Sequence, residues 1–172
     1  MYNWDITLTL NKIDRNTMNE KQLTLDKRYI RMAGIWAENS YCERRKVGAL
    51  IVLQNDLPLD DIKHTGDIIN AKIGQRLVEN IFFKNSPLHD GAMIISGHRI
   101  AAAACMPVSN DLDIPKHFGL RHRAARGISK DTDALAIVVS EETGNITAAY
   151  NNKFRARLTA EELELILTKG KF

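Results

Sequence analysis

The chain has 172 residues, of which 44% are apolar and 26% are charged, and these values are ordinary for one compact globular domain. The formal charge is only +3, with acidic and basic residues interleaved, which argues against bulk nucleic-acid binding but allows a local pocket for an anionic small molecule. Cys42 and Cys105 lie far apart and form no Cys-x-x-Cys pair, which argues against a zinc motif or a disulfide framework.

The first half of the chain predicts an arm, a helix and a buried strand. Residues 1–24 include a short alternating apolar and polar piece, and we assign them to an N-terminal arm of unknown role. Apolar side chains recur at helical spacing over 26–41, which predicts an amphipathic helix. The run Val47–Leu53 is apolar throughout, as expected for a strand buried on both faces. Two more helices are predicted, over Leu59–Asp61 and Asn70–Phe82, with a break at His64–Gly66.

Four strands and two helices are predicted in the rest of the chain. The strands form two hairpins, Ala92–Ser96 with Arg99–Met106 and Ala134–Val139 with Ile146–Tyr150. One helix covers Leu120–Gly127 with Gly127 as its C-cap, and the last covers Thr159–Leu167 with a Thr159/Glu162 capping box. Because tight turns join several strands, we expect an α/β (α+β) fold, with a mixed, largely antiparallel central β-sheet flanked by helices, in one domain over residues 25–172.

The first candidate site is Leu88-His89-Asp90-Gly91-Ala92, where a carboxylate precedes a glycine at the mouth of a predicted strand. The glycine leaves room for a phosphate or a metal ion to approach the backbone. An isolated Asp-Gly, however, is more often a simple turn in which the carboxylate hydrogen-bonds its neighbours. This cluster alone therefore does not identify a site.

The second candidate is Gly119–Arg123, which places Arg121 and Arg123 at the start of a predicted helix. Helix N-termini and arginine side chains both bind phosphate, although a solvated helix face is the commoner explanation of such a basic tripeptide. The third is Ser140-Glu141-Glu142, which taken alone would be an ordinary loop. Together the clusters supply the acids and arginines that metal-assisted phosphoryl transfer requires.

The order and spacing of these clusters resemble a known family. The segments NSPLHDGAMII (85–95), AAAAC (101–105), GLRHRAARGIS (119–129) and IVVSEETG (137–144) closely resemble the diadenylate cyclase domain, over about residues 44–167 and with both its Asp-Gly-Ala and Arg-His-Arg motifs. The resemblance implies a nucleotidyltransferase that condenses two ATP molecules into cyclic di-AMP and releases two pyrophosphates. It also implies a divalent metal cofactor, Mg²⁺ or Mn²⁺.

The resemblance assigns roles to single residues. Asp90 would bind the metal and help to activate the ribose 3′-hydroxyl, with His89 and Glu141 as further metal ligands. Adenine would lie against the strands Val47–Leu53 and Ala101–Met106. The implied catalytic residues are Asp90, Gly91, Ala92, Arg121, His122 and Arg123. The implied ATP-binding residues are Leu88, Ala104, Cys105, Met106, Gly119, Leu120, Arg121, His122, Arg123, Ser140 and Glu141.

Two positions depart from the family pattern. Leu120 stands where many members carry threonine, so one hydroxyl contact to phosphate is missing, and Met106 stands where some relatives have an aromatic residue. The reaction itself implies a homodimer with facing active sites, because one ATP must present its 3′-hydroxyl to the α-phosphate of another, twice. The alternative function is a catalytically weak or inactive module that binds ATP or cyclic di-AMP.

Residues 18–52 show a second resemblance, to the opening helix and strand of a deoxycytidylate deaminase. The zinc motifs of that enzyme, His-x-Glu or Cys-x-Glu and Pro-Cys-x-x-Cys, are absent from the chain, so a deaminase is a distant third hypothesis. Two explanations stay open: a natural or engineered fusion joined near Val47–Val52, or an ordinary amphipathic helix that caps the sheet.

No apolar stretch reaches the roughly 20 residues that a membrane-spanning helix needs, and the first twenty residues lack the apolar core of a secretory signal. We therefore expect no membrane segment in this chain and a cytoplasmic location. Related cyclases are often anchored to the membrane through N-terminal helices, which this chain lacks.

Overall fold

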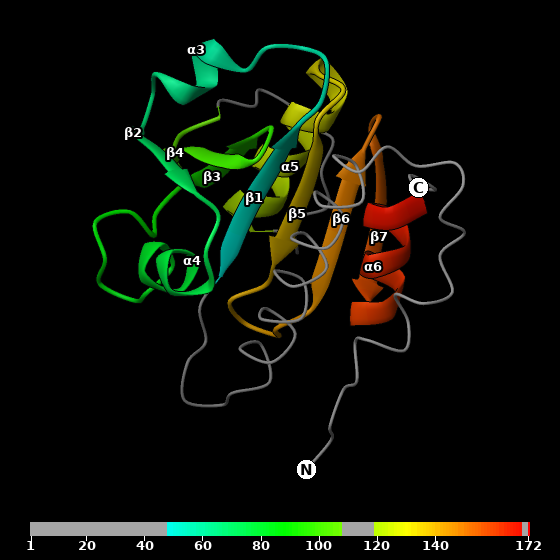
Figure 1. Ribbon diagram of the computed structural model, residues 1–172. Helices are drawn as coiled ribbons and strands as arrows, with labels where there is room; N and C mark the ends of the chain where they lie inside the picture. Colours follow the sequence, from blue (N-terminus) through cyan, green and yellow to red (C-terminus); the bar gives the residue numbers. More distant parts are fainter. Residues whose placement is uncertain (1–47, 108–118, 170–171) are drawn as a thin grey trace, which may run out of the picture.

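The computed structural model describes residues 48–107, 119–169 and 172, and the predicted arm 1–24 and helix 26–41 lie outside them (Figure 1). The described elements, in chain order, are β1 Ala49–Gln54, α3 Asp60–Lys63, β2 Asp67–Lys72, α4 Gln75–Ile81, β3 Ala92–Ser96, β4 Arg99–Cys105, α5 Leu120–Asp131, β5 Leu135–Val139, β6 Ile146–Tyr150, β7 Lys153–Leu158 and α6 Ala160–Lys169.

The seven strands of the described residues form one sheet in the order β2-β4-β3-β1-β5-β6-β7. β1 and β3 are parallel, and the other neighbouring pairs are antiparallel. A parallel pair needs a crossover connection, which the segment with α3, β2 and α4 supplies between β1 and β3. The predicted mixed, largely antiparallel sheet is confirmed.

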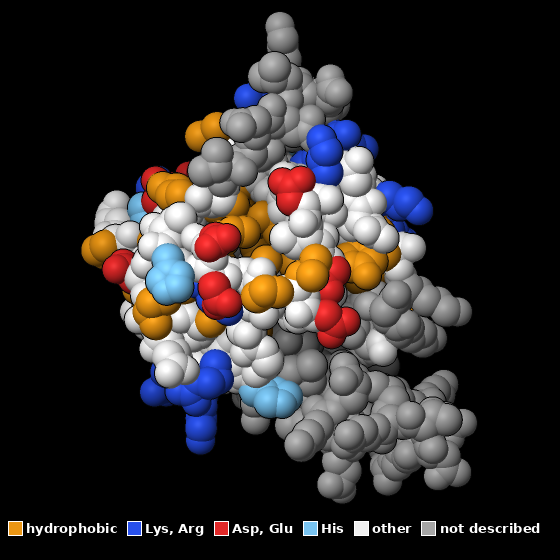
Figure 2. Space-filling view, turned by 90° about the horizontal axis from the view of Figure 1, so that it is seen from above, with side chains coloured by type: hydrophobic (Ala, Val, Ile, Leu, Met, Phe, Trp, Pro, Cys, Tyr) orange, Lys and Arg blue, Asp and Glu red, His pale blue; other side chains and the backbone are white. Residues whose placement is uncertain are grey.

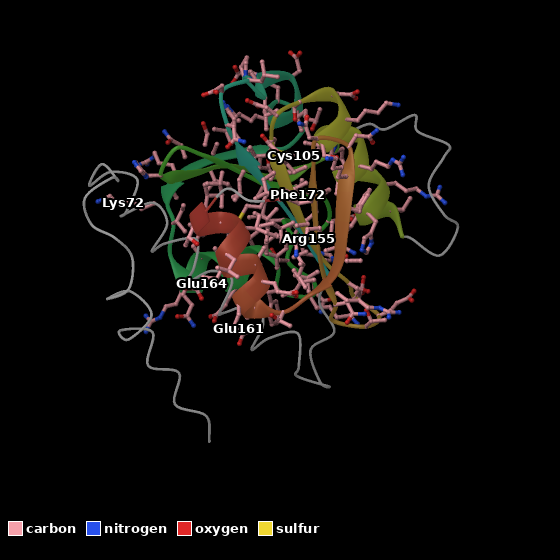
Figure 3. All side chains as sticks on the ribbon, turned by 90° about the vertical axis from the view of Figure 1, so that its right-hand side faces the viewer. Lys72, Cys105, Arg155, Glu161, Glu164 and Phe172 are labelled. Carbon is pink, nitrogen blue, oxygen red and sulfur yellow. The ribbon has the colours of Figure 1, made fainter. Side chains whose placement is uncertain are left out.

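Helices cover both faces of this sheet, with β1 at its centre. Side chains of a strand alternate between the two faces, so Leu50 and Val52 pack in a core with α5, whereas Ile51 and Leu53 pack in a core with α4 and α6. Figure 3 shows the same layers from the side, with α5 and α6 on opposite faces of the sheet. β1 is therefore buried on both faces, as its sequence predicts.

Several other elements agree with the sequence. α3, β3, β4, β5 and β6 lie close to their predicted positions. The capping box before α6 is confirmed, because the backbone N–H of Thr159 donates to Glu162 Oε2 (2.8 Å) and the N–H of Glu162 donates to Thr159 Oγ1 (3.2 Å).

The predicted helix over Asn70–Phe82 is wrong in its first part. Residues Asp67–Lys72 form β2, which pairs antiparallel with β4, and the helix is confined to Gln75–Ile81. In β2, Ile69 is half-buried between the exposed residues Ile68 and Asn70, which is the alternation of a strand. Pairing with β4 outweighs the helical spacing of the apolar residues further along the chain.

Two further differences concern α5 and β7. The predicted helix end at Gly127 is wrong, because Gly127 is buried inside α5 and the helix continues to Asp131. Thr132 closes it instead, with its N–H (2.9 Å) and its hydroxyl (2.7 Å) both donating to the carbonyl of Ile128. β7 was not predicted, because an edge strand with exposed basic side chains shows little apolar alternation.

Candidate active site

The strand register aligns the ends of four neighbouring strands, β4, β3, β1 and β5. We use "this edge" and "the site edge" for the line along which these strand ends lie, not for an outermost strand. Ala92, at the start of β3, pairs with Leu50 on β1 and with Cys105 at the end of β4. Ala49, at the start of β1, pairs with Val139 at the end of β5. The candidate segments before β3, after β4 and after β5 therefore lie along the same edge, although they are far apart in sequence.

The turn before β3 is organised by Ser86. Its hydroxyl accepts the N–H of Leu88 (3.2 Å), and its carbonyl lies 3.2 Å from the backbone nitrogen of His89 and 2.5 Å from His89 Nδ1. Gly91 follows with φ +119°, a conformation that favours glycine, and a Cβ there would lie 2.7 Å from the backbone of Ala104. Gly91 therefore lets the turn lie directly against β4.

Asp90 projects from this turn and is exposed. Within the described part of the chain, its carboxylate makes no hydrogen bond and no ion pair. The structure therefore does not have the simple Asp-Gly turn in which the carboxylate hydrogen-bonds its own neighbours. The carboxylate is available to a ligand.

Arg121 lies in the first turn of α5 and reaches the same edge. Its Nη1 is 3.1 Å from Glu141 Oε2, just beyond the end of β5, and a Cβ on Gly48 would lie 2.8 Å from the same Nη1. Arg121 Nε is buried and donates to no acceptor in the described residues. The guanidinium is thus anchored on one side and has an unused donor on the other.

The rest of the Arg-His-Arg segment surrounds the helix start. His122 is half-buried and Arg123 is exposed. Gly119 is the N-cap and offers no side-chain acceptor to the first backbone N–H groups, and Leu120 is 82% exposed. A helix start without a side-chain cap and with basic side chains attracts anions.

Ser140 shapes the turn after β5. Its N–H donates to Asn145 O (3.0 Å), and its hydroxyl accepts the N–H of Thr143 (3.3 Å). Glu141 and Glu142 are exposed in this turn. Ser140 therefore holds Glu141 in place opposite Arg121.

Of the two strands predicted to lie against adenine, only the end of β4 has accessible side chains. Ala104 has φ +54° and is half-buried, and Met106 is 52% exposed, so both can meet a ligand. The N–H of Met106 donates to Thr65 Oγ1 (2.9 Å), which fixes the end of the strand. The side chains of β1, by contrast, are enclosed in the two cores and offer no open wall.

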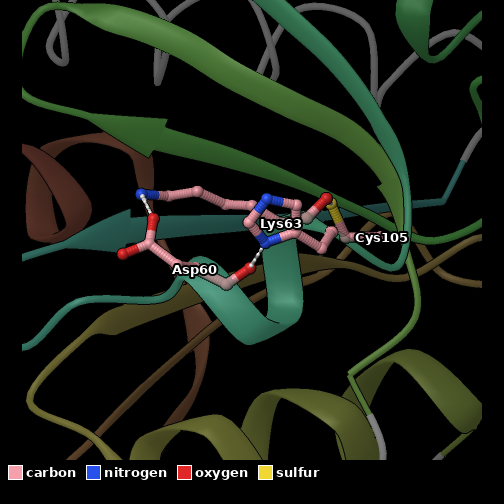
Figure 4. A network of polar contacts seen from close by, with 4 residues as sticks. Asp60, Lys63 and Cys105 are labelled. Atoms are coloured by element: carbon pink, nitrogen blue, oxygen red, sulfur yellow. Dashed lines mark hydrogen bonds and ion pairs between the residues drawn. The ribbon is translucent and has the colours of Figure 1, made fainter.

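Cys105 points away from this edge into the core. The residue is fully buried, and its Sγ lies 3.8 Å from the carbonyl oxygen of Lys63 (Figure 4). Burial, with a smaller contribution from the charge of Asp67, raises the pKa of the thiol to about 11. Its side chain packs the strand instead of facing a nucleotide.

The predicted metal ligands Asp90, His89 and Glu141 do not form a preformed cluster. No group of three His, Cys, Asp or Glu side chains is close enough to hold an ion in the described ranges. Among the residues that the structure describes, Asp90 and His89 Nε2 have no partner, whereas Glu141 Oε2 already contacts Arg121. Mg²⁺ usually takes one or two protein carboxylates and completes its shell with water and substrate phosphates, so Asp90 fits this kind of site.

Three residues of this region were missed in the sequence. Gly48 borders Arg121, Ser86 shapes the turn before Asp90, and Thr65 fixes the end of β4. A glycine that opens a strongly apolar strand was the available signal for Gly48, and the Ser-Pro pair was a turn signal for Ser86. Nothing local in the sequence indicates Thr65, because its partner is 41 residues away.

On the face shown in Figure 2, acidic side chains lie near the centre and basic side chains lie toward the margins, so this face has no broad basic area. Within the described residues, no helix is long and apolar enough to cross a bilayer.

Comparison with known proteins identifies the family. The family described as DisA bacterial checkpoint controller nucleotide-binding, abbreviated DAC, matches residues 39–154. The chain belongs to this family. The Asp-Gly-Ala and Arg-His-Arg segments of the DAC domain both lie within the matched residues.

The chain is also similar to proteins named as a cyclic di-AMP synthase and as diadenylate cyclases. The chain is 46% identical over 129 residues to the cyclic di-AMP synthase CdaA of Bacillus subtilis. This match covers 74% of this chain and 47% of the relative. It is 48% identical over 130 residues to a diadenylate cyclase of Listeria monocytogenes, and this match covers 75% of this chain and 48% of the relative. The chain thus spans about half the length of these relatives.

A solved structure supports the same assignment at the level of the fold. DacA from Staphylococcus aureus, in a double-mutant form, matches with a TM-score of 0.77 and 38% sequence identity. The match covers 88% of this chain and 97% of that chain. The mixed sheet flanked by helices is therefore the DAC-domain fold, as the resemblance implied.

Proposed function

We propose that this chain is a diadenylate cyclase that condenses two ATP molecules into cyclic di-AMP. The observation that carries the proposal is that the strand register aligns the segments of Asp90 and Glu141 at one edge of the sheet, where Arg121 contacts Glu141, in a chain of the DAC family. The names of the relatives from B. subtilis and L. monocytogenes support the same reaction.

The proposed roles follow from what each side chain has free. The Arg121 guanidinium is one quarter exposed, and α5 begins without a side-chain cap, so both are suited to the negatively charged triphosphate. Asp90 offers an unpaired carboxylate, suited to orient the 3′-hydroxyl and accept its proton. The 3′ oxygen then forms a bond to the α-phosphorus of the second ATP while the bond to pyrophosphate breaks.

A divalent metal, Mg²⁺ or Mn²⁺, belongs to this proposal. When bound, it would supply neutralisation of charge on the phosphates. Asp90 would hold it, with His89 as a second candidate through Nε2. Glu141 is the weakest of the three predicted ligands, because its Oε2 is engaged by Arg121.

Ring closure requires two nucleotides and therefore two copies of the site. Both bonds of the product form between different ATP molecules, and two subunits related by a twofold axis can present them face to face. Leu120 and Met106, both largely exposed on elements that form the site edge, are suited to contact a second subunit or the bases. We propose a homodimer for the active form.

Residues 25–172 are proposed to form one catalytic domain. The DAC match begins at residue 39, ahead of the possible join at Val47–Val52, which supports one continuous domain over a fusion. Deleting residues 1–24 should then leave ATP binding and product formation intact. Loss of both in a folded deletion variant would contradict this boundary.

Incubation with ATP and either Mg²⁺ or Mn²⁺ tests the function. The expected result is a chromatographic peak of cyclic di-AMP together with pyrophosphate at two per product molecule. Tight ATP binding without product in either metal would favour the non-catalytic binding module. Incubation of dCMP with Zn²⁺ should leave the dCMP unchanged.

A further inference from the structure

Gly48 is buried immediately before β1, at the edge where the candidate site lies. Its φ lies outside the left-handed region, unlike that of Gly91 at +119°. The backbone there is therefore one that alanine adopts without strain. Alanine normally stabilises such a position relative to glycine, because it restricts the unfolded chain.

The reason for glycine at position 48 is space for a neighbouring side chain. A Cβ there would lie 2.8 Å from Nη1 of Arg121, 3.1 Å from Cζ of Arg121 and 3.0 Å from Cβ of Glu141. Separations this short cannot be kept, so one of the groups must move. The guanidinium is the end of a flexible side chain, and it is the group that would be displaced.

Position 48 shares a sheet face with the helix that carries Arg121. Side chains alternate along β1, and Leu50, two residues on, packs in the core beside α5. The missing side chain at Gly48 thus opens the sheet surface under the first turn of α5. Glu141 closes the other side through its 3.1 Å contact with Arg121.

Of the nitrogens of the Arg121 guanidinium, only Nη1 contacts an acceptor within the described residues, so the other N–H groups are left for a ligand. Arg121 Nε is buried and meets no acceptor in the described part of the protein. The side chain is nevertheless one quarter exposed, so a ligand oxygen can approach the accessible part of the guanidinium. Displacing the guanidinium would change the direction of its N–H groups and its contact with Glu141 together.

We propose that Gly48 is a positioning residue, which together with Glu141 holds the Arg121 guanidinium ready to bind a phosphate of the nucleotide. The inference rests on the proposed function in that it takes ATP as the ligand. Gly48 itself makes no contact with the nucleotide and acts only through Arg121.

A double-mutant cycle on ATP affinity, measured by calorimetry, tests the proposal. Gly48→Ala should weaken ATP binding about 10- to 100-fold, the range for loss of a charge-assisted hydrogen bond, while the unfolding temperature is retained. In the Arg121→Ala background, the same substitution should change the affinity by less than about twofold. Gly74→Ala is the matched control, because a Cβ there meets nothing within 4 Å, and it should bind as the wild type does.

Two outcomes would overturn the inference: wild-type affinity in folded Gly48→Ala, or an equal loss with and without Arg121. If Gly48→Ala does not fold, Glu141→Ala takes its place in the cycle, and an effect that persists without Arg121 sinks the proposal. Product formation is scored separately. If the wild-type protein binds ATP but makes no cyclic di-AMP, the proposed function is wrong. The double-mutant cycle on ATP affinity still decides the role of Gly48 in that case.

Discussion

Arg121 Nη1 lies 3.1 Å from Glu141 Oε2, which joins the first turn of α5 to the turn after β5. The guanidinium is one quarter exposed and the carboxylate is about half exposed, so the pair is a surface ion pair of modest strength. Its importance is geometric, because it fixes the direction of the guanidinium. Because the pair adds little stability, the protein should fold without Arg121.

Arg121→Ala should weaken ATP binding and lower turnover together, because an arginine that contacts phosphate acts in the ground state as well as in the transition state. The expected fall in kcat/KM is roughly 30- to 150-fold, which corresponds to a loss of about 2–3 kcal/mol of transition-state stabilisation. Steady-state kinetics with ATP would measure it. Arg76→Ala on α4 removes an exposed arginine elsewhere and should have no effect.

Asp90→Asn should abolish product formation and leave the fold intact. The carboxylate is exposed and makes no contact within the described residues, so the amide costs no packing and no internal hydrogen bond. It removes the charge that metal binding and proton acceptance need. Thermal unfolding and a product assay, run beside Asp131→Asn at the far end of α5, check both halves. Full turnover in Asp90→Asn would show that the assigned acid is wrong.

Thr159→Ala should destabilise the protein by about 1 kcal/mol, because it removes the hydroxyl that accepts the N–H of Glu162. The free energy of unfolding in urea measures this loss. Thr159→Ser keeps the hydroxyl and should retain most of the stability. Equal losses in the two variants would instead point to the methyl group of Thr159.

The thiol of Cys105 should resist modification at pH 8. Burial raises its pKa to about 11, so almost no thiolate is present in the folded protein at that pH. A thiol reagent should titrate Cys105 in the Cys42→Ser variant only after unfolding. Rapid labelling of the folded variant would contradict the buried position.

The same shift predicts a loss of stability in alkali. The thiol ionises near pH 9 in the unfolded chain and near pH 11 in the folded protein, so the folded state binds more protons between these values. Stability should therefore fall as pH rises from 9 to 11, by on the order of 1–2 kcal/mol. Unfolding measured against pH in wild type and Cys105→Ala isolates this contribution.

The buried strands and the capping box could be predicted from the sequence because their signals are local. β1 is apolar on both faces, and Thr159 and Glu162 lie three residues apart. β2 could not be separated from α4 in the same way, because its strand character depends on pairing with β4 about thirty residues later. Gly127 was misread as a helix end because its role, close packing inside α5, appears only in three dimensions.

The candidate site divides along the same line. Asp90 and Arg121 were predicted as site residues because charged residues stand beside small ones, and the family resemblance implied their roles. Their supporting residues Gly48 and Thr65 were missed, because each acts on a residue distant in sequence. The family resemblance implied that Cys105 binds the nucleotide, but its side chain lies on the buried side of β4.

The pairing of Ala49 with Val139 joins residues ninety positions apart. The proposed nucleotide site is therefore complete only when the two halves of the chain have associated. A truncated polypeptide that stops before β5 would lack half of the edge, however well its first strands form. Protection by ATP against heat or proteolysis should therefore serve as a direct assay of complete folding.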